Sequence, residues 1–530
     1  YSTAPTSTLV LHSGHVLDIV ASQPDRLWLI YSDGVIDQVD TKANKVLKRY
    51  DGFSKALDTK PRSFIMIMDN KQNLWICSDA GTIGVYCYKT STNALVHYSK
   101  DSALGKLNSN VITSIIQTDD NKIWVGSDHG GINVIDPVTN KVSYIVSKAD
   151  DAKSLSGNSL YLYKDNTGII WAGTFKQGVN YYHKGIMQFP LYRHFTTDLK
   201  SLPFEDINSF EEDTKQNLWI GTNGNGLIYF NRATNTYTQF KHDPSNPNSL
   251  SNDIIIRLYI DRQNRLWIGT YFGGLDCYDG KTFKHYRHNK QDPGSLTDDR
   301  VYTIIEDAAG ELWVGTFSGG FNVFNPKTNS FKHPKYPGNS DYTAVIYEDT
   351  QKNKWVGRDR GVDVIMNGTN KVKHYMSQPK NLNSLAGNDV NTITQDRNGL
   401  LWIGTKDGLS ILNTKTNRFL NMEEGVNLPA NNVSNIIEDD EGLMWVSTTN
   451  GLASIKLSQV GGKYNAQINN YNELDGLQGR AFNLYAAKKL KSGELVFGGS
   501  HGFNLFDPKV LDTFKPRPNL LFTDLRLFNK

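Results

Sequence analysis

The residues best suited to chemistry follow a recurring Trp-Ile-Gly-Thr segment, at a point where the sequence varies from copy to copy. They are Tyr271, Phe272, Phe317, Asp359, Arg360, Lys406, Asp407 and His501. The flat C–H faces of a sugar stack on aromatic rings, and its hydroxyl groups bond to planar polar side chains. The sequence therefore predicts a surface that binds an oligosaccharide, with these residues as candidate ligand contacts.

The sharpest departure from the recurring segment is "KWVGRDRG", in which Arg358 replaces the usual Thr and Arg360 follows two residues later. Two guanidinium groups can hold a carboxylate or a sulfate of an acidic sugar in bidentate fashion. An arginine at the edge of a sheet also commonly pairs with a neighbouring carboxylate. Both roles stay open for Arg358 at the level of sequence.

A second group of candidates lies where the repeats are interrupted, in "GVNYYHKGIMQFPLYRHF". Its candidate ligand contacts are Tyr181, Tyr182, Arg193 and His194. Ligands often bind where two domains meet. Packing between two domains would explain the same residues.

An enzyme of the glycoside hydrolase or polysaccharide lyase type is the main alternative function. It would need paired carboxylates, or a Tyr/His acid and base, on residues that do not repeat. The frequent Asp residues belong to recurring turns, and the twelve histidines form no HExxH or triad signature. We therefore predict no catalytic residues, metal or cofactor in this chain. A scaffold that binds other proteins is a third possibility.

The strands that position these candidate residues can be predicted from an internal repeat of 42 to 49 residues. Every tryptophan stands at the same point of this repeat. The ten copies carry Trp28, Trp75, Trp124, Trp171, Trp219, Trp267, Trp313, Trp355, Trp402 and Trp445. An eleventh copy has Val496 instead. Each unit holds four short apolar or alternating runs separated by turn residues, as in 390–422. Four such strands per period predict an all-β fold, in which each unit is one blade of a β-propeller.

Strand parity predicts where the candidate residues lie. The turn between the first and second strands carries Asp followed by Gly or Asn, as in "EDDEGLMW". If the first strand runs from one face of the ring to the other, these turns share the second face. The loops before strand one and after strand two then share the first face, with the candidate ligand contacts.

The repeats divide the chain into tandem propellers. Seven copies, from Trp219 to Val496, fit one complete seven-bladed ring over residues 188–515. The four earlier copies, in residues 1–187, are interpreted as the last four blades of a first propeller, itself a fragment of a seven-bladed ring; a self-contained four-bladed ring is the alternative. Residues 516–530 break the repeat with an alternating strand, which predicts the start of a β-sandwich domain.

Composition excludes other classes of protein. The 57 basic and 54 acidic residues are scattered, with a formal net charge of +3, so no basic stripe is available for nucleic acid. The three cysteines, Cys77, Cys87 and Cys277, indicate neither a disulfide framework nor a zinc site. No apolar run approaches the roughly 18 residues of a membrane span, and no signal peptide is seen. The chain begins at Tyr1, which we interpret as a piece of a longer protein.

The units at 382–413 and 428–452 resemble two-component regulator propeller repeats, and "GFNLFDPKVLDTFKPRPNLLFTDLRLFNK" resembles the passage into a Y_Y_Y domain. The combination is similar to the extracytoplasmic sensor region of hybrid two-component system proteins. The resemblance implies a periplasmic, homodimeric sensor of oligosaccharides. It also implies a membrane helix and a histidine kinase outside this chain, which switch on polysaccharide-utilisation genes. The incomplete first propeller and the near absence of the Y_Y_Y domain depart from that pattern.

Overall fold

The computed structural model describes residues 9–58, 61–103, 105–151, 154–183, 189–334, 342–369, 371–422, 428–460 and 463–511. The chain divides into two compact units, which we call unit 1 (Tyr1–Lys184) and unit 2 (Gly185–Lys530). Each unit is described by itself. The predicted sandwich segment, residues 516–530, lies outside the described residues.

Unit 1 consists of antiparallel sheets, each built from strands that are consecutive in sequence. Its strands are β1 (Val16–Gln23), β2 (Arg26–Tyr31), β3 (Ile36–Asp40) and β4 (Lys45–Tyr50); β5 (Ile65–Met68), β6 (Leu74–Cys77), β7 (Val85–Lys89) and β8 (Ala94–Tyr98); β9 (Ile112–Gln117), β10 (Ile123–Ser127), β11 (Ile132–Ile135) and β12 (Val142–Ile145); and β13 (Leu160–Lys164), β14 (Ile170–Thr174) and β15 (Gly178–Tyr182). A short helix, α1 (Gly52–Ala56), follows β4.

Unit 2 repeats the same antiparallel sheet. Its strands are β16 (Leu191–Tyr192); β17 (Ile207–Glu212), β18 (Leu218–Thr222), β19 (Leu227–Asn231) and β20 (Thr236–Phe240); β21 (Ile255–Ile260), β22 (Leu266–Thr270), β23 (Leu275–Tyr278) and β24 (Phe283–Tyr286); β25 (Val301–Glu306), β26 (Leu312–Thr316), β27 (Phe321–Asn325) and β28 (Ser330–Lys332); β29 (Val345–Glu348), β30 (Lys354–Arg358), β31 (Gly361–Ile365) and β32 (Val372–Tyr375); β33 (Val390–Gln395), β34 (Leu401–Thr405), β35 (Gly408–Asn413) and β36 (Arg418–Met422); β37 (Val433–Glu438), β38 (Met444–Thr448), β39 (Gly451–Val460) and β40 (Lys463–Tyr471); and β41 (Phe482–Lys489), β42 (Leu495–Gly499) and β43 (Gly502–Phe506). Two short 3-10 helices cover Glu473–Asp475 and Pro508–Val510.

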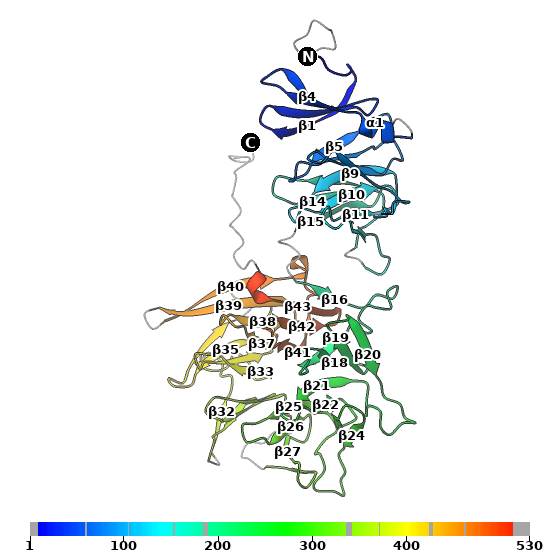
Figure 1. Cartoon of the computed structure of the whole chain (residues 1–530). Coiled ribbons are helices and arrows are strands. Elements are labelled where there is room, and N and C mark those ends of the chain that lie inside the picture. The colour runs from blue at the N-terminus through cyan, green and yellow to red at the C-terminus, as the bar shows by residue number, and fades with distance from the viewer. Residues whose placement is uncertain are drawn as a thin grey trace. The chain divides into compact units, whose positions relative to one another are not determined.

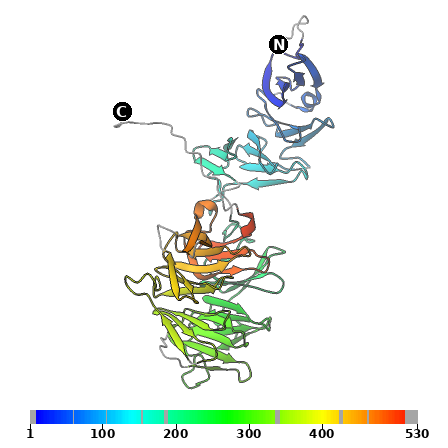
Figure 2. The ribbon, with the colours of Figure 1, turned by 90° about the vertical axis from the view of Figure 1, so that its left-hand side faces the viewer.

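The first strands of the sheets in unit 2 form a closed circle. Strands β17, β21, β25, β29, β33, β37 and β41 each lie beside the next, and β41 lies beside β17 again. Strand β16, from the start of the unit, completes the last sheet by pairing with β43 (Figure 1). The ring of Tyr192 stacks on Phe503 at 4.8 Å, so aromatic packing reinforces this closure. The turned view shows the same sheets of unit 2 packed face to face (Figure 2).

The recurring Asp and Trp explain why each sheet has the same shape. In the β37–β38 turn, one Asp439 carboxylate oxygen accepts hydrogen bonds from the backbone N–H groups of Glu441 and Leu443, each at 2.9 Å. The other oxygen accepts from the indole N–H of Trp445 at 2.9 Å. The carboxylate thus satisfies the turn and a buried tryptophan together. The same bond joins Asp69, Asp165, Asp261, Asp307, Asp349 and Asp396 to the tryptophan six residues on.

The last sheet of unit 1 is packed differently from the sheets of unit 2. Trp171 in β14 is 38% exposed, whereas Trp267, Trp402 and Trp445 are fully buried. Tyr161 and Tyr163 of β13 are also exposed. In the described part of unit 1, β1, β5, β9 and β13 lie side by side in that order. The interpretation of this unit as part of a larger propeller stays a prediction.

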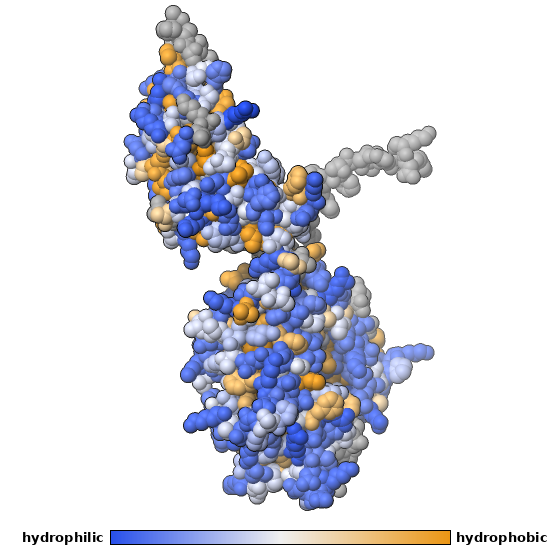
Figure 3. All heavy atoms as spheres, turned by 90° about the vertical axis from the view of Figure 1, so that its right-hand side faces the viewer, coloured by the Kyte–Doolittle hydropathy of each residue, from blue (hydrophilic) through white to orange (hydrophobic). Residues whose placement is uncertain are grey.

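The predicted all-β propeller class is confirmed by the sheet architecture of both units. On the face of the molecule drawn in Figure 3, hydrophobic residues are interspersed with hydrophilic ones. Among the described residues, no helix is long and apolar enough to span a membrane.

Candidate functional site

Loops that follow the second strand of each sheet lie at one end of unit 2. The backbone N–H of Tyr271 donates to the carbonyl of Ile254, just before β21, at 3.0 Å. Phe317 makes the same bond to Arg300, before β25, also at 3.0 Å. Equivalent bonds start at Asn223, Lys406 and Thr449. These bonds hold the variable loops against the segments that lead into the first strands. We call this end of unit 2 the loop end.

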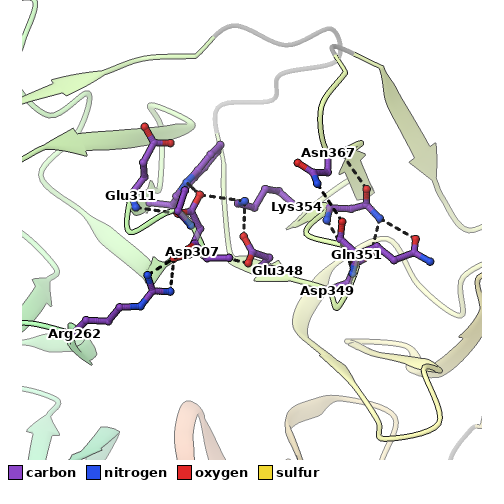
Figure 4. A network of polar contacts seen from close by, with 12 residues as sticks. Arg262, Asp307, Glu311, Glu348, Asp349, Gln351, Lys354 and Asn367 are labelled. Atoms are coloured by element: carbon purple, nitrogen blue, oxygen red, sulfur yellow. Dashed lines mark hydrogen bonds and ion pairs between the residues drawn. The ribbon is translucent and has the colours of Figure 1, made fainter.

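The opposite end, which carries the Asp turns, is occupied by bonds between neighbouring sheets. Figure 4 shows Lys354 of β30 between Glu348 and Asp307, with Nζ to carboxylate oxygen distances of 2.5 and 3.2 Å. Arg262, from the preceding turn, donates to the backbone carbonyl of Asp307 at 2.7 Å. The Lys354 ammonium also lies 5.3 Å from the centre of the Trp313 ring. Charged groups at this turn end thus hold the sheets together.

Five aromatic side chains gather at the loop end on the second to fourth sheets of unit 2. We call them the aromatic platform: Tyr271, Phe272, Tyr302, Phe317 and Tyr342. The rings of Tyr302, Phe317 and Tyr342 contact one another, with centroids 5.4 to 5.8 Å apart. Tyr271 and Phe272 pack edge to face at 4.3 Å. Tyr271 is close enough to Tyr302 to contribute to the raised pKa of Tyr302, so the sequence-predicted residues Tyr271, Phe272 and Phe317 lie in one region.

The outer rings of the aromatic platform are open to solvent. Phe272 is 59% exposed and Phe317 is 41% exposed. Clustered, exposed apolar rings lose contact with water when a ligand covers them, which makes this group a candidate binding surface. Burial raises the pKa of Tyr342 to about 12 and also raises the pKa of Tyr302. Their hydroxyl groups are therefore neutral donors and acceptors at physiological pH.

Polar groups border the platform. Arg300 lies 4.3 Å from the centre of the Phe317 ring and forms an ion pair with Asp298 at 2.7 Å. Burial acts to raise the pKa of Asp298, but hydrogen bonds from Arg300 and Ser318 outweigh it and lower the pKa. An ionised carboxylate and a guanidinium beside exposed rings can bond to sugar hydroxyl groups. This arrangement combines stacking with fixed polar contacts.

Tyr485 joins the platform from across the ring of sheets. In β41, Phe482 pairs with Gly499 and Ala487 with Phe497, so four residues of β41 stand opposite one residue of β42. Five other first strands of unit 2 have a single bulged residue, such as Tyr302 in β25. The larger bulge lets the Tyr485 ring reach Tyr302, at 6.4 Å, and Arg257 of β21, at 5.3 Å.

Sequence reasoning missed Arg257, Arg300, Tyr302, Tyr342 and Tyr485, although a signal for Tyr302 exists. The single bulged residue is Asn208 in β17, Asn391 in β33 and Ser434 in β37. Each of these side chains donates a hydrogen bond of 2.9 Å to a carbonyl of the next sheet. Ile256 and Tyr302 occupy this position in β21 and β25. The repeat therefore loses its polar link between sheets where the platform stands.

The structure places Arg358 inside the fourth sheet. Its side chain is 3% exposed, and Nε forms an ion pair with Asp363 at 2.9 Å. The other Asp363 oxygen pairs with Nδ1 of His374 at 2.7 Å. Arg358 also donates to the backbone carbonyl of Tyr342 at 3.3 Å. Of the two roles that the sequence left open, the structure describes the pair with a neighbouring carboxylate.

The other predicted loop residues are exposed at the loop end but lie on different sheets. Asp359 and Arg360 follow β30, and Lys406 and Asp407 follow β34. Lys406 pairs with Asp389 at 3.1 Å. His501, which follows β42, contacts the Ser500 hydroxyl at 3.0 Å. None of these five residues makes a ring contact with the platform in the part of the chain that the structure describes.

The candidates near the interruption of the repeats fall in separate units. Tyr181 and Tyr182 belong to β15 of unit 1, where Tyr182 packs on Trp124 at 5.2 Å. Arg193 lies 5.2 Å from the Phe195 ring in unit 2. Nδ1 of His194 bonds to the carbonyl of Leu202 at 2.8 Å. His242 and His288 make the same bond eight residues on, so His194 follows the repeat.

No group of three or more His, Cys, Asp or Glu side chains is placed to hold a metal ion within the described residues. The three cysteines are buried thiols. Burial raises the pKa of Cys87 to about 12 and that of Cys277 to about 11, so these thiols stay protonated at physiological pH.

The family model "Two component regulator propeller" matches six segments, at residues 106–129, 201–224, 249–272, 295–318, 384–407 and 427–450. These segments are two-component regulator propeller repeats. One repeat lies in unit 1 and five lie in unit 2. The regulator propeller repeats at 249–272 and 295–318 contain four of the five platform residues: Tyr271, Phe272 and Phe317 follow second strands, and Tyr302 lies in the first strand β25.

Several solved structures are similar to this chain. The extracellular domain of BT4673 from B. thetaiotaomicron is 20% identical over 95% of this chain and 70% of that chain, with a TM-score of 0.49. The extracellular domain of BT3049 from the same organism is 19% identical over 95% of this chain and 82% of that chain, with a TM-score of 0.32. PorZ of Porphyromonas gingivalis is 15% identical over 93% of this chain and 80% of that chain, with a TM-score of 0.43. No curated protein matches the chain.

Proposed function

We propose that this chain is the periplasmic, ligand-sensing part of a hybrid two-component system, and that unit 2 binds an oligosaccharide on the aromatic platform. One observation carries the proposal: exposed Phe317 stands beside the Arg300–Asp298 pair at the loop end, and exposed Phe272 packs on Tyr271 in the corresponding loop of the neighbouring sheet. The regulator propeller repeats support the assignment to a two-component system. The kinase, the membrane helix and most of a Y_Y_Y domain would lie in parts of the protein outside this chain.

The signal in this proposal is a change in how two copies of the sensor are arranged. A ligand shifts such an equilibrium only by the difference between its affinities for the two arrangements. The full-length receptor would be a homodimer whose kinase output switches on polysaccharide-utilisation genes. If an oligosaccharide that binds the platform changes neither the arrangement of the two copies nor the kinase output of the full-length receptor, this mechanism is wrong.

Isothermal titration calorimetry of this chain with neutral and acidic oligosaccharides tests binding. Phe317→Ala removes the central exposed ring of the platform, and we expect the affinity for the bound glycan to fall about tenfold or more, since a buried aromatic contact contributes over 1 kcal/mol. Phe175→Ala is the matched control, because Phe175 is 71% exposed and makes the same backbone bond in unit 1.

The outcomes of this titration distinguish a site on the platform from a site on unit 1 and from a scaffold function. Weaker binding in Phe317→Ala alone supports the platform. Weaker binding in Phe175→Ala alone moves the site to unit 1 and contradicts the proposal. Absence of binding across the panel, together with capture of a protein ligand by the loop end of unit 2, would favour the scaffold function instead.

A further inference from the structure

Arg257 is a charged side chain near the axis of unit 2 that has no polar partner among the described residues. It lies in β21 and pairs with Gly269 of β22. Gly269 in turn stands two residues before the platform residue Tyr271. The side chain is only partly exposed, and its Nε atom is buried without a hydrogen-bond partner. Among the described residues, Arg257 makes neither a hydrogen bond nor an ion pair. Arginines with this degree of burial are normally paired, because removing a charge from water is costly.

The carboxylate whose charge acts most strongly on Arg257, that of Glu211, already has a bonded partner. The negative charge of Glu211, on the neighbouring strand β17, favours the protonated guanidinium, although burial lowers the pKa of Arg257. Both Glu211 oxygens, however, bond to Nζ of Lys488 at 2.8 Å. Glu211 and Lys488 thus satisfy each other, and the positive charge of Arg257 lacks a bonded counter-ion within the described residues.

Tyr485 supplies the second observation. Its backbone has a φ angle of 64°, a region that bulky residues rarely adopt. The strained backbone places the Tyr485 ring 5.3 Å from the Arg257 guanidinium carbon. Local strain of this kind persists where the surrounding structure enforces it, commonly at ligand sites. The same ring contacts Tyr302, so Tyr485 links Arg257 to the aromatic platform.

We propose that Arg257 binds the carboxylate or sulfate group of an acidic oligosaccharide whose sugar rings lie on the aromatic platform. The guanidinium offers N–H donors in a planar fork that matches either anion, while the Tyr485 ring packs against it. This inference rests on the proposed function, because it names the substrate class of that site. Arg300 and Arg358 are less suited to the role, because each is already paired with an aspartate.

Inorganic sulfate is the probe for the anion site itself. We measure the melting temperature of the whole chain in sodium sulfate and in sodium chloride of equal ionic strength. At ten times its Kd, sulfate bound at one site should raise the melting temperature by about 2 °C beyond its general effect. This extra rise should disappear in Arg257→Gln and persist in part in Arg257→Lys. Arg480→Gln is the matched control, because Arg480 is an exposed, surface-paired arginine of the same unit.

The melting temperature without sulfate separates a binding role from a structural one. Because Arg257 has no bonded partner in the described part of the chain, Arg257→Gln should melt at or above the wild-type temperature. A lower melting temperature together with an unchanged sulfate effect would show that Arg257 is structural and would overturn the proposal. If Arg257→Gln fails to fold, the wild-type protein and Arg257→Lys still decide, since a wild type without a sulfate-specific rise contradicts the site.

Calorimetry distinguishes an anion carried by a sugar from a free anion. An acidic oligosaccharide should bind the wild-type chain at least tenfold more tightly than its neutral counterpart, and Arg257→Gln should abolish this preference. If sulfate binds at Arg257 but acidic and neutral oligosaccharides bind equally, the site takes a free anion and the saccharide assignment is wrong. Phe317→Ala should weaken both sugars while leaving the sulfate effect intact, so failure of the platform and failure of the anion site give different results.

Discussion

The rings of Tyr485 and Tyr302 lie 6.4 Å apart across the axis of unit 2. Their strands, β41 and β25, belong to sheets that are separated by at least two other sheets around the ring. The contact depends on the four-residue bulge in β41 and on the positive φ angle of Tyr485. A residue of the closing sheet thus completes a surface that otherwise comes from the second to fourth sheets.

The positive φ angle of Tyr485 predicts that a glycine variant is more stable than an alanine variant, which is the reverse of the usual order in a strand. Both Tyr485→Ala and Tyr485→Gly remove the ring contacts, but glycine adopts a φ angle of 64° without the penalty of about 1–2 kcal/mol that alanine pays. We expect Tyr485→Gly to have the higher free energy of unfolding, by about 1 kcal/mol, in urea denaturation. In an ordinary strand alanine is the more stable of the two, so that order at position 485 would contradict the strained backbone.

Replacing the turn Asp that bonds to the tryptophan should lower the free energy of unfolding by different amounts in the two units. Asp439→Ala leaves the N–H of fully buried Trp445 without a partner and removes two further bonds to backbone N–H groups. We expect the free energy of unfolding of unit 2 to fall by about 3 kcal/mol. Asp165→Ala makes the same change beside Trp171, which is 38% exposed, so water replaces the lost bond and the expected cost is about 1 kcal/mol.

The measurement for this pair is urea denaturation, followed separately for the unfolding transition of each unit. Equal costs for Asp439→Ala and Asp165→Ala would show that the turn, rather than the buried indole, dominates the interaction. The exposure of the tryptophan would then not control the value of the bond.

Alanine substitutions of Arg358 and Arg360 should differ sharply in their effect on stability, although the two residues are only two positions apart. Arg358→Ala leaves Asp363 as a buried charge with only His374 beside it, and we expect a loss of about 3–5 kcal/mol in the free energy of unfolding. Because Arg358 also holds the carbonyl of Tyr342, the variant should weaken oligosaccharide binding indirectly. Arg360→Ala, at an exposed position, should change stability by less than about 0.5 kcal/mol. A stable Arg358→Ala protein would contradict the buried ion pair.

His285 predicts a pH dependence of stability. Its hydrogen bond to Asp276, at 2.6 Å, raises the pKa of His285 in the folded state, although burial opposes the shift. A raised folded pKa stabilises the fold fully below the unfolded pKa of about 6.5, and the stabilisation is lost as pH rises through the folded value. We expect the free energy of unfolding of the wild type to exceed that of His285→Gln by about 1.5–3 kcal/mol near pH 6, with a smaller difference near pH 9.

Urea denaturation of both proteins between pH 6 and pH 9 checks this dependence. His129→Gln is the control for loss of one histidine, because the side chain of His129 is 87% exposed. A difference between wild type and His285→Gln that grows with pH would reverse the expected sign and contradict the raised pKa.

The sequence by itself determined the repeat, the four-stranded blade and the end at which Tyr271, Phe272 and Phe317 lie. These features depend on interactions within one repeat, such as the alternation of a strand, the Asp turn and the bond from the loop to the residue before the first strand. Each is written into about 45 consecutive residues, and the chain repeats it. Because the same local rules act in every copy, they can be recognised without knowing how the copies assemble.

Only the tertiary structure decided which loop residues meet and which charges are already paired. Arg358 replaces the usual Thr of the repeat and Arg257 stands where β25 has Thr303, yet one is buried against Asp363 and the other has no bonded partner among the described residues. The contact of Tyr485 with Arg257 and Tyr302 joins residues of different sheets. Closure of the ring and the direction of the β41 bulge bring these sheets together. Neither can be predicted from the spacing of residues within one repeat.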